Sequence, residues 1–160
     1  MFPSCEEAEK ILNESVPLNP GPWGNHCRLV AYCAKKIGAA AGLDENKAYV
    51  CGLLHDIGRR FGVRHLGHVS DGYSYMMSLG FDEVAKICLT HSFSSNNTDD
   101  YIGKFDTTED ELKLIQEKLK DIEFDDYDRL IQLCDSLATG EAIMTIEDRM
   151  ESWWNMDERQ

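Results

Sequence analysis

Residues 51–59, CGLLHDIGR, are the stretch of the sequence that indicates the fold most clearly. Its apolar first half leads directly into His55 and Asp56, and Gly58 follows as a helix stop. A histidine and an aspartate beside an apolar run cost on the order of several kcal/mol to bury unless they are paired or bound to a metal ion. The stretch therefore predicts a buried helix whose carboxyl end carries a polar site.

The same helical pattern extends outward in both directions. Apolar residues recur at helical spacing, capping residues such as Ser4 and Asp44 precede the runs, and no period-two alternation predicts a strand. The expected helices span Cys5–Leu12, Asn25–Ala41, Glu45–Ile57, His68–Leu79, Glu83–His91, Thr108–Lys120 and Asp125–Gly140, with a short last one at Ile146–Trp154. We predict an all-α, single-domain helical bundle of about seven helices with one core, over residues 1–160.

Cysteine usage and apolar content bear on the compartment. None of the six cysteines forms a C-x-x-C pair, and five lie in apolar helical contexts, where a reduced thiol packs as a small hydrophobe. The acidic start of the chain, residues 1–10, argues against a secretory signal. No apolar run is long enough to cross a bilayer. These features predict a cytoplasmic protein with no membrane partner.

The net charge of −13 is unevenly distributed. Residues 1–80 hold eight acidic and eight basic side chains, so residues 81–160 carry the whole excess of negative charge. Such a surface repels a phosphate polymer, which argues against a nucleic acid partner. A small anionic substrate is expected to enter on the neutral side, although a merely solvated acidic surface also explains the pattern.

Histidines and aspartates outside the quoted stretch complete a candidate metal site. His26 and His91 lie near helix ends, and Asp135 interrupts the apolar run 130–138, where an unpaired carboxylate is costly. Imidazole nitrogen with carboxylate oxygen is typical of a transition-metal site rather than a calcium site. We expect one or two divalent ions, with iron, manganese, zinc, cobalt and nickel as the candidates and magnesium as a further option.

The order of these residues resembles a known family. His26, His55, Asp56 and Asp135 are similar to the H…HD…D signature of the HD-domain superfamily of phosphohydrolases. Residues 53–59 resemble its LLHDIGK form in the HDIG-like subgroup, residues 68–72 its H-P-x-x-G element, and residues 87–91 its I-x-x-H-H element. The resemblance covers residues 23 to 140 and implies an HD-type helical fold over that core.

The resemblance also implies the ligands. It assigns a first metal to His26, His55, Asp56 and Asp135. It assigns a second metal to His68 and His91, with Asp56 bridging and His65 as the alternative to His68. It gives catalytic roles to Asp56 and Arg59. The family often has lysine at position 59 and a second histidine at position 92, where this chain has Arg59 and Ser92.

The activity that follows is hydrolysis of a phosphoester or phosphoanhydride bond by metal-activated water. The expected substrate is a small phosphorylated metabolite, with a nucleotide favoured. The enzyme would be a nucleotidase, a phosphodiesterase or a dinucleoside polyphosphate hydrolase. The candidate substrate-binding cations are Arg59, Arg60, Arg64 and Lys104.

Several alternatives stay open. A metal-binding regulatory domain without turnover and a di-iron oxygenase of HD type share the ligand pattern. The long polar segment 92–107 fits either a lid or an ordinary loop. Trp153 and Trp154 are expected to cover the core, with a homodimer surface as the other reading.

Overall fold

The computed structural model describes residues 1–157, and these form an all-α fold, as predicted. Among the described residues there are eight α-helices and three short 3-10 helices, joined by turns and loops. Ala138 and Ile143 form an isolated β-bridge. The α-helices are α1 (Cys5–Ser15), α2 (Trp23–Ala40), α3 (Glu45–Leu54), α4 (Gly67–Ser78), α5 (Asp82–Thr90), α6 (Glu109–Lys120), α7 (Asp126–Leu137) and α8 (Ile146–Asp157). The 3-10 helices are η1 (Val16–Leu18), η2 (Ile57–Phe61) and η3 (Thr98–Asp100).

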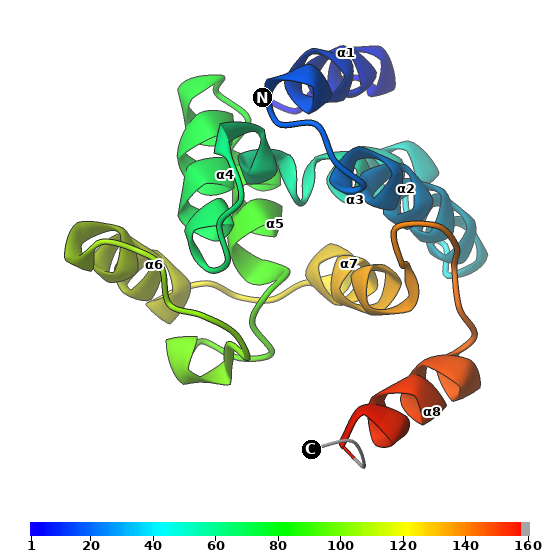
Figure 1. The fold of residues 1–160 in the computed structure, drawn as a ribbon. Helices are drawn as coiled ribbons and strands as arrows, with labels where there is room; N and C mark the ends of the chain where they lie inside the picture. The colour runs from blue at the N-terminus through cyan, green and yellow to red at the C-terminus, as the bar shows by residue number, and fades with distance from the viewer. Residues whose placement is uncertain (158–160) are drawn as a thin grey trace.

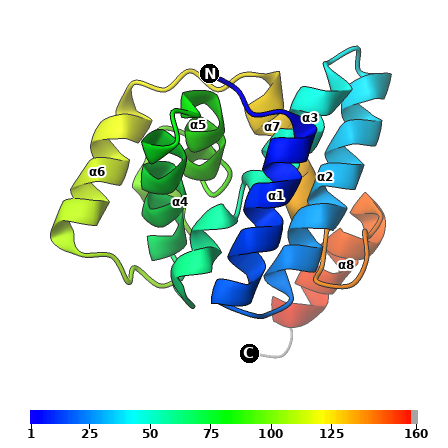
Figure 2. The ribbon, with the colours of Figure 1, turned by 90° about the horizontal axis from the view of Figure 1, so that it is seen from above.

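The helices fall into two packed sets that meet along the middle of the molecule (Figures 1 and 2). One set holds α1, α2, α3 and α7, and the other holds α4, α5 and α6. Contacts of α5 with α3 and α7 join the two sets. Helix α8 extends away from the bundle and makes its main contacts with α7 (Figure 1). The ends of α3, α5 and α7 consequently lie near one another at the junction.

Local capping explains where several helices begin. Ser4 caps α1 and forms a reciprocal capping box with Glu7, and the Asp44 side chain accepts from two backbone N–H groups at the start of α3. Thr108 and Asp125 cap α6 and α7 in the same way. The predicted starts of these helices are therefore confirmed to within a residue.

Three predicted features were wrong. Helix α3 ends at Leu54 rather than Ile57, because the chain turns at His55 and enters η2, so the expected loop from Arg59 is partly helical. Helix α7 ends at Leu137 rather than Gly140, because the backbone at position 138 becomes extended. The tryptophans of α8 do not cover the core: Trp153 is 45% exposed and Trp154 is 71% exposed, because α8 projects from the bundle.

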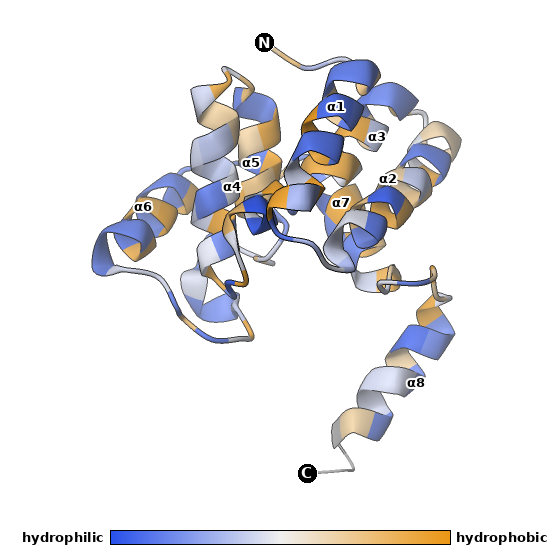
Figure 3. Ribbon diagram, turned by 45° about the horizontal axis from the view of Figure 1, so that its top comes forward, coloured by the Kyte–Doolittle hydropathy of each residue, from blue (hydrophilic) through white to orange (hydrophobic). Residues whose placement is uncertain are grey.

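Apolar side chains fill three clusters between the helices. Figure 3 marks hydrophobic and hydrophilic positions along each helix, and most helices carry both kinds. The first cluster lies among α1 to α5, the second joins α2, α3, α5 and α7, and the third fixes α6 against α4 and α5. Five cysteines are buried as free thiols, as expected. Segment 92–107 is not a simple solvated loop, since Phe93 enters the third cluster and η3 lies within it.

A buried carboxylate ties α5 to α7. Asp128 is fully buried and accepts from the Thr90 hydroxyl at 2.6 Å and from its own capping partner, the Asp125 backbone N–H, at 2.8 Å. The Lys86 ammonium lies 2.7 Å from its second oxygen. This network fixes the end of α5, which carries His91, against the helix that carries Asp135.

Asp128→Ala is expected to destabilise the fold by about 3–5 kcal/mol, because it leaves the buried Thr90 hydroxyl without its acceptor and removes the shorter of the two ion pairs of Lys86. The measurement is urea unfolding followed by circular dichroism. Asp126→Ala, an exposed aspartate at the start of the same helix, is the control and should cost less than about 1 kcal/mol. Equal losses in the two variants would contradict the assignment.

Candidate metal centre

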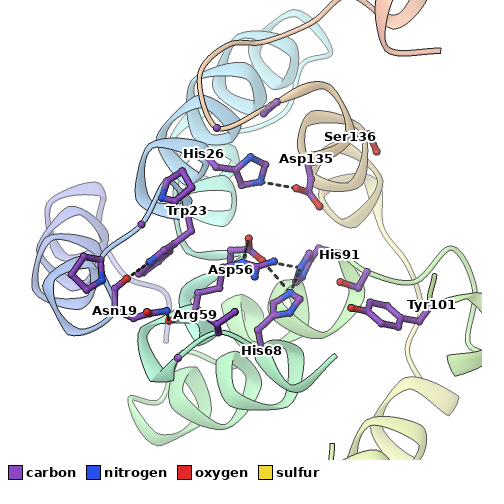
Figure 4. A pocket seen from close by; sticks show the side chains of 18 of the residues that line it. Asn19, Trp23, His26, Asp56, Arg59, His68, His91, Tyr101, Asp135 and Ser136 are labelled. Carbon is purple, nitrogen blue, oxygen red and sulfur yellow. Dashed lines mark hydrogen bonds and ion pairs between the residues drawn. The ribbon is translucent and has the colours of Figure 1, made fainter. Parts of the chain in front are cut away.

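Two groups of potential metal ligands lie at the junction of the two helical sets. Group one consists of His26, His55 and Asp135, and group two consists of Asp56, His68 and His91. Within each group the ligand atoms lie within 4.8 Å of one another. Figure 4 shows five of the six side chains, contributed by α2, α4, α5, α7 and the turn after α3, pointing toward a shared space.

Group one is centred on the Asp135 carboxylate. Its Oδ1 lies 2.8 Å from His26 Nε2 and 3.4 Å from His55 Nε2. The His55 side chain is completely buried, whereas His26 and Asp135 are partly accessible. The group therefore has one closed side, formed by His55, and one side open to the solvent.

Group two is centred on Asp56. Its Oδ1 lies 3.1 Å from His68 Nε2 and 3.2 Å from His91 Nε2. Its Oδ2 accepts from Arg59 Nε at 2.6 Å and lies 3.9 Å from His55 Nε2. The family resemblance implies that Asp56 binds the first metal and bridges to the second. The structure brings it closest to His68 and His91 and leaves its other oxygen facing group one.

The same hydrogen-bond pattern orients all four imidazoles. Each Nδ1 donates to a backbone carbonyl, which can only accept, so in the neutral imidazole it is Nε2 that carries the lone pair. The acceptors are Thr139 O for His26 (3.3 Å), Gly52 O for His55 (2.7 Å), His65 O for His68 and Cys88 O for His91 (2.8 Å). Imidazoles fixed through Nδ1 by a second partner are typical of metal sites.

The four Nε2 atoms face the carboxylates of Asp56 and Asp135 and lie close to one another. Those of His68 and His91 are 3.2 Å apart, and that of His55 is buried with no hydrogen-bond partner. Lone pairs and carboxylates in this arrangement repel unless a cation or extra protons lie among them. Nitrogen and oxygen donors in these numbers fit a divalent transition metal in each group.

Without metal, protons compensate part of this charge. Burial opposes ionisation of both carboxyls, yet the charges of His55 and His68 hold the pKa of Asp56 well below its usual range. Burial is likewise outweighed at Asp135, whose pKa is lowered by the charge of His55 and the hydrogen bond with His26. Burial lowers the pKa of His26 and of His55. The carboxylates of Asp56 and Asp135 raise both pKa values by more, so the net shift is upward. The carboxylates are therefore anionic at neutral pH and attract cations.

A cavity of about 700 Å³ opens onto both groups. Five of the predicted ligands line it directly, and His55 lies behind Asp135. Of the predicted substrate-binding cations, only Arg59 lines the cavity. His65 is in neither group; its backbone carbonyl accepts from His68 Nδ1 instead.

The other predicted cations are engaged elsewhere. Arg60 donates to the Ser15 hydroxyl and lies over the Tyr75 ring, and Arg64 bonds to Asp71 and Glu111. The backbone carbonyl of Lys104 accepts a hydrogen bond from the Leu66 N–H, which fixes the segment before α6 to the start of α4. None of these three side chains lines the cavity. The two arginines are bonded to residues outside it, and Lys104 lies in the segment between η3 and α6.

The cavity also contains side chains that the sequence analysis did not select. They include Asn19, Trp23, Tyr101, Arg149 and Trp153. Arg149 and Trp153 are four residues apart on the predicted last helix, so a shared face could have been inferred. Nothing in the sequence indicates that this face borders the metal site.

Comparison with known proteins bears on the same residues. A family model described as "HD domain" matches residues 23–140, which is the span of the motif resemblance. No match was found among curated proteins or among solved structures. None of the helices in the described part of the chain is long and apolar enough to cross a membrane.

Proposed function

Because the chain belongs to the HD-domain superfamily of metal-dependent phosphohydrolases, we propose that it hydrolyses a phosphate ester or anhydride of a small metabolite, with a nucleotide favoured. Group one and group two would each hold a divalent transition metal ion. The observation that carries the proposal is the convergence of four Nε2 atoms and two carboxylates, each imidazole fixed through its Nδ1.

The bound ions would act as Lewis acids on a phosphoryl oxygen and lower the pKa of water. Asp56 is placed to contact both groups, since its Oδ1 faces His68 and His91 and its Oδ2 faces His55. Arg59 is bonded to Asp56 through Nε, and its terminal nitrogens bond to no described residue. Those nitrogens are therefore available to bind phosphate oxygens beside the ligand groups.

The cavity supports a small substrate. Its volume of about 700 Å³ lies within the range of roughly 300–1,000 Å³ that is common for small-molecule sites. Trp23 and Tyr101 provide aromatic surface in its wall, which favours a ligand with a planar ring. The acidic excess of residues 81–160 argues against a nucleic acid polymer.

The test combines metal analysis with a panel of phosphomonoesters, phosphodiesters and nucleotides. We expect the purified chain to bind up to two transition-metal ions and to release phosphate only when they are present. His55→Ala should lose the ion of group one and the activity, because His55 closes the buried side of that group. The control is His65→Ala, which removes an imidazole that belongs to neither group.

The outcomes separate the proposal from its rivals. Phosphate release that persists without metal, or unchanged metal content in His55→Ala, would contradict it. Stoichiometric metal without turnover on the whole panel would favour a metal-binding regulatory domain. Bound iron with oxygen consumption would favour a di-iron oxygenase.

A further inference from the structure

Helix α8 lies apart from the bundle (Figures 1 and 3), yet two of its residues line the cavity. Arg149 and Trp153, one helical turn apart, line the cavity together with ligands of both groups. The guanidinium of Arg149 lies 5.0 Å from the centre of the Trp153 ring, within cation–π range. One face of α8 is thus part of the cavity wall.

Arg149 differs from the other arginines of residues 1–157 because its guanidinium donates no hydrogen bond to a described residue. Arg28, Arg59 and Arg64 pair with carboxylates, and Arg60 and Arg129 donate to neutral oxygens. The Arg149 side chain donates no hydrogen bond to a residue within 1–157, and its Nε is buried without a partner. A buried guanidinium nitrogen that lacks an acceptor indicates a site that a ligand anion would complete.

The position of Arg149 is the rim of the cavity rather than its floor. The floor is formed by the buried residues of the ligand groups, with His55 1% and Asp56 4% exposed. The rim includes Trp153, which is 45% exposed, and the accessible side chain of Val63. Among the described residues that line the cavity, Arg59 and Arg149 are the arginines and there is no lysine; Arg59 is bonded to Asp56 at the floor, and Arg149 lies at the rim.

The turn before α8 connects this rim to group one. The Thr139 carbonyl accepts from His26 Nδ1, and the Gly140 carbonyl accepts from Asn25 Nδ2 at 2.6 Å. Met144 N–H donates to the Leu137 carbonyl at 2.8 Å and closes the turn. Residues that fix a metal ligand therefore also fix the start of α8.

We propose that α8 is a substrate-binding element in which Arg149 binds a second anionic group of the substrate while Trp153 supports the guanidinium. This inference rests on the proposed function, since it takes the reacting phosphate to lie at the ligand groups beside Arg59. The favoured substrate class is then a phosphorylated compound with a second phosphate or carboxylate at its far end. A compound with a single phosphate would occupy the floor and leave Arg149 without an acceptor.

The test measures binding of non-hydrolysable probes to the metal-loaded chain by calorimetry. The probes are α,ω-alkane bisphosphonates of graded length and alkyl monophosphonates of matching length. We expect the wild type to prefer a bisphosphonate of one length by about 10- to 100-fold over its monophosphonate, as for a hydrogen-bonded charge pair. Arg149→Gln should remove this preference and leave monophosphonate binding and metal content unchanged.

The matched control is Arg129→Gln. Arg129 also lies over an aromatic ring, that of Phe124, but it does not line the cavity, so this variant should retain the preference. Arg149→Lys should retain part of it, since the positive charge remains. Circular dichroism verifies that each variant is folded.

A wild-type chain without preference for the second phosphonate would overturn the inference, and so would an Arg149→Gln variant that keeps it. The result is separate from turnover because phosphonates are not hydrolysed. Length-dependent binding in a chain that hydrolyses nothing on the panel would support the role of α8 and contradict only the proposed hydrolysis.

Discussion

Asp56→Asn is expected to lower metal-dependent phosphate release by about 10²- to 10⁴-fold, the equivalent of losing one partner of a buried charge network. The carboxylate contributes Oδ1 to His68 and His91 and Oδ2 to Arg59. An asparagine keeps the shape but replaces one oxygen with an N–H donor, which cannot ligate a cation. Its loss of negative charge also leaves Arg59 without its ion-pair partner.

The measurements are metal content by elemental analysis and the rate on the most active compound of the panel. We expect Asp56→Asn to lose the ion of group two and to retain at most part of that in group one, because Asp56 reaches group one only through the 3.9 Å approach to His55. Asp71→Asn is the control: it also removes an aspartate paired with an arginine, but one outside both groups. An Asp56→Asn chain with full metal and full rate would show that Asp56 is not a ligand.

Much of the fold could be predicted because its determinants are local. Ser4, Asp44 and Thr108 cap helices through bonds to residues three or fewer positions away, so their side-chain chemistry is readable in sequence order. The ends of α3 and α7 could not be predicted in the same way. Those ends depend on the conformation of the backbone that follows: η2 after α3, and the turn closed by the bridge between Ala138 and Ile143 after α7.

The candidate site shows the same division. The six predicted ligands come together in space because the helix ends that carry them meet at one junction, which the order of motifs anticipates. Which arginine lines the cavity could not be predicted, because this depends on the partner of each guanidinium. Arg59 bonds to Asp56, three residues away, and stays at the site, whereas Arg64 bonds to Glu111, 47 residues away. Arg149 was missed because only the path of the chain after α7 brings α8 to the cavity.

Gly58 was expected to stop a helix, and this was wrong, because α3 ends at Leu54 and Gly58 lies inside η2. A glycine is required there for another reason: η2 packs against α4 in very close contact. A Cβ added at Gly58 would lie 2.0 Å from the His68 carbonyl oxygen and 2.6 Å from the Gly72 nitrogen. Both are backbone atoms of α4, so no side chain can rotate away to make room.

Gly58→Ala is therefore expected to destabilise the fold by about 3 kcal/mol or more, because η2 and α4 must separate to admit one methyl group. The same displacement moves the backbone of His68, so metal should be lost from group two even where the chain remains folded. Urea unfolding gives the free energy, and elemental analysis of the folded fraction gives the metal content. Gly21→Ala is the control, because its added Cβ would meet nothing closer than the Trp23 ring at 3.6 Å. If the two alanine variants unfolded at the same urea concentration and held equal metal, the close approach of η2 to α4 would not be what positions His68.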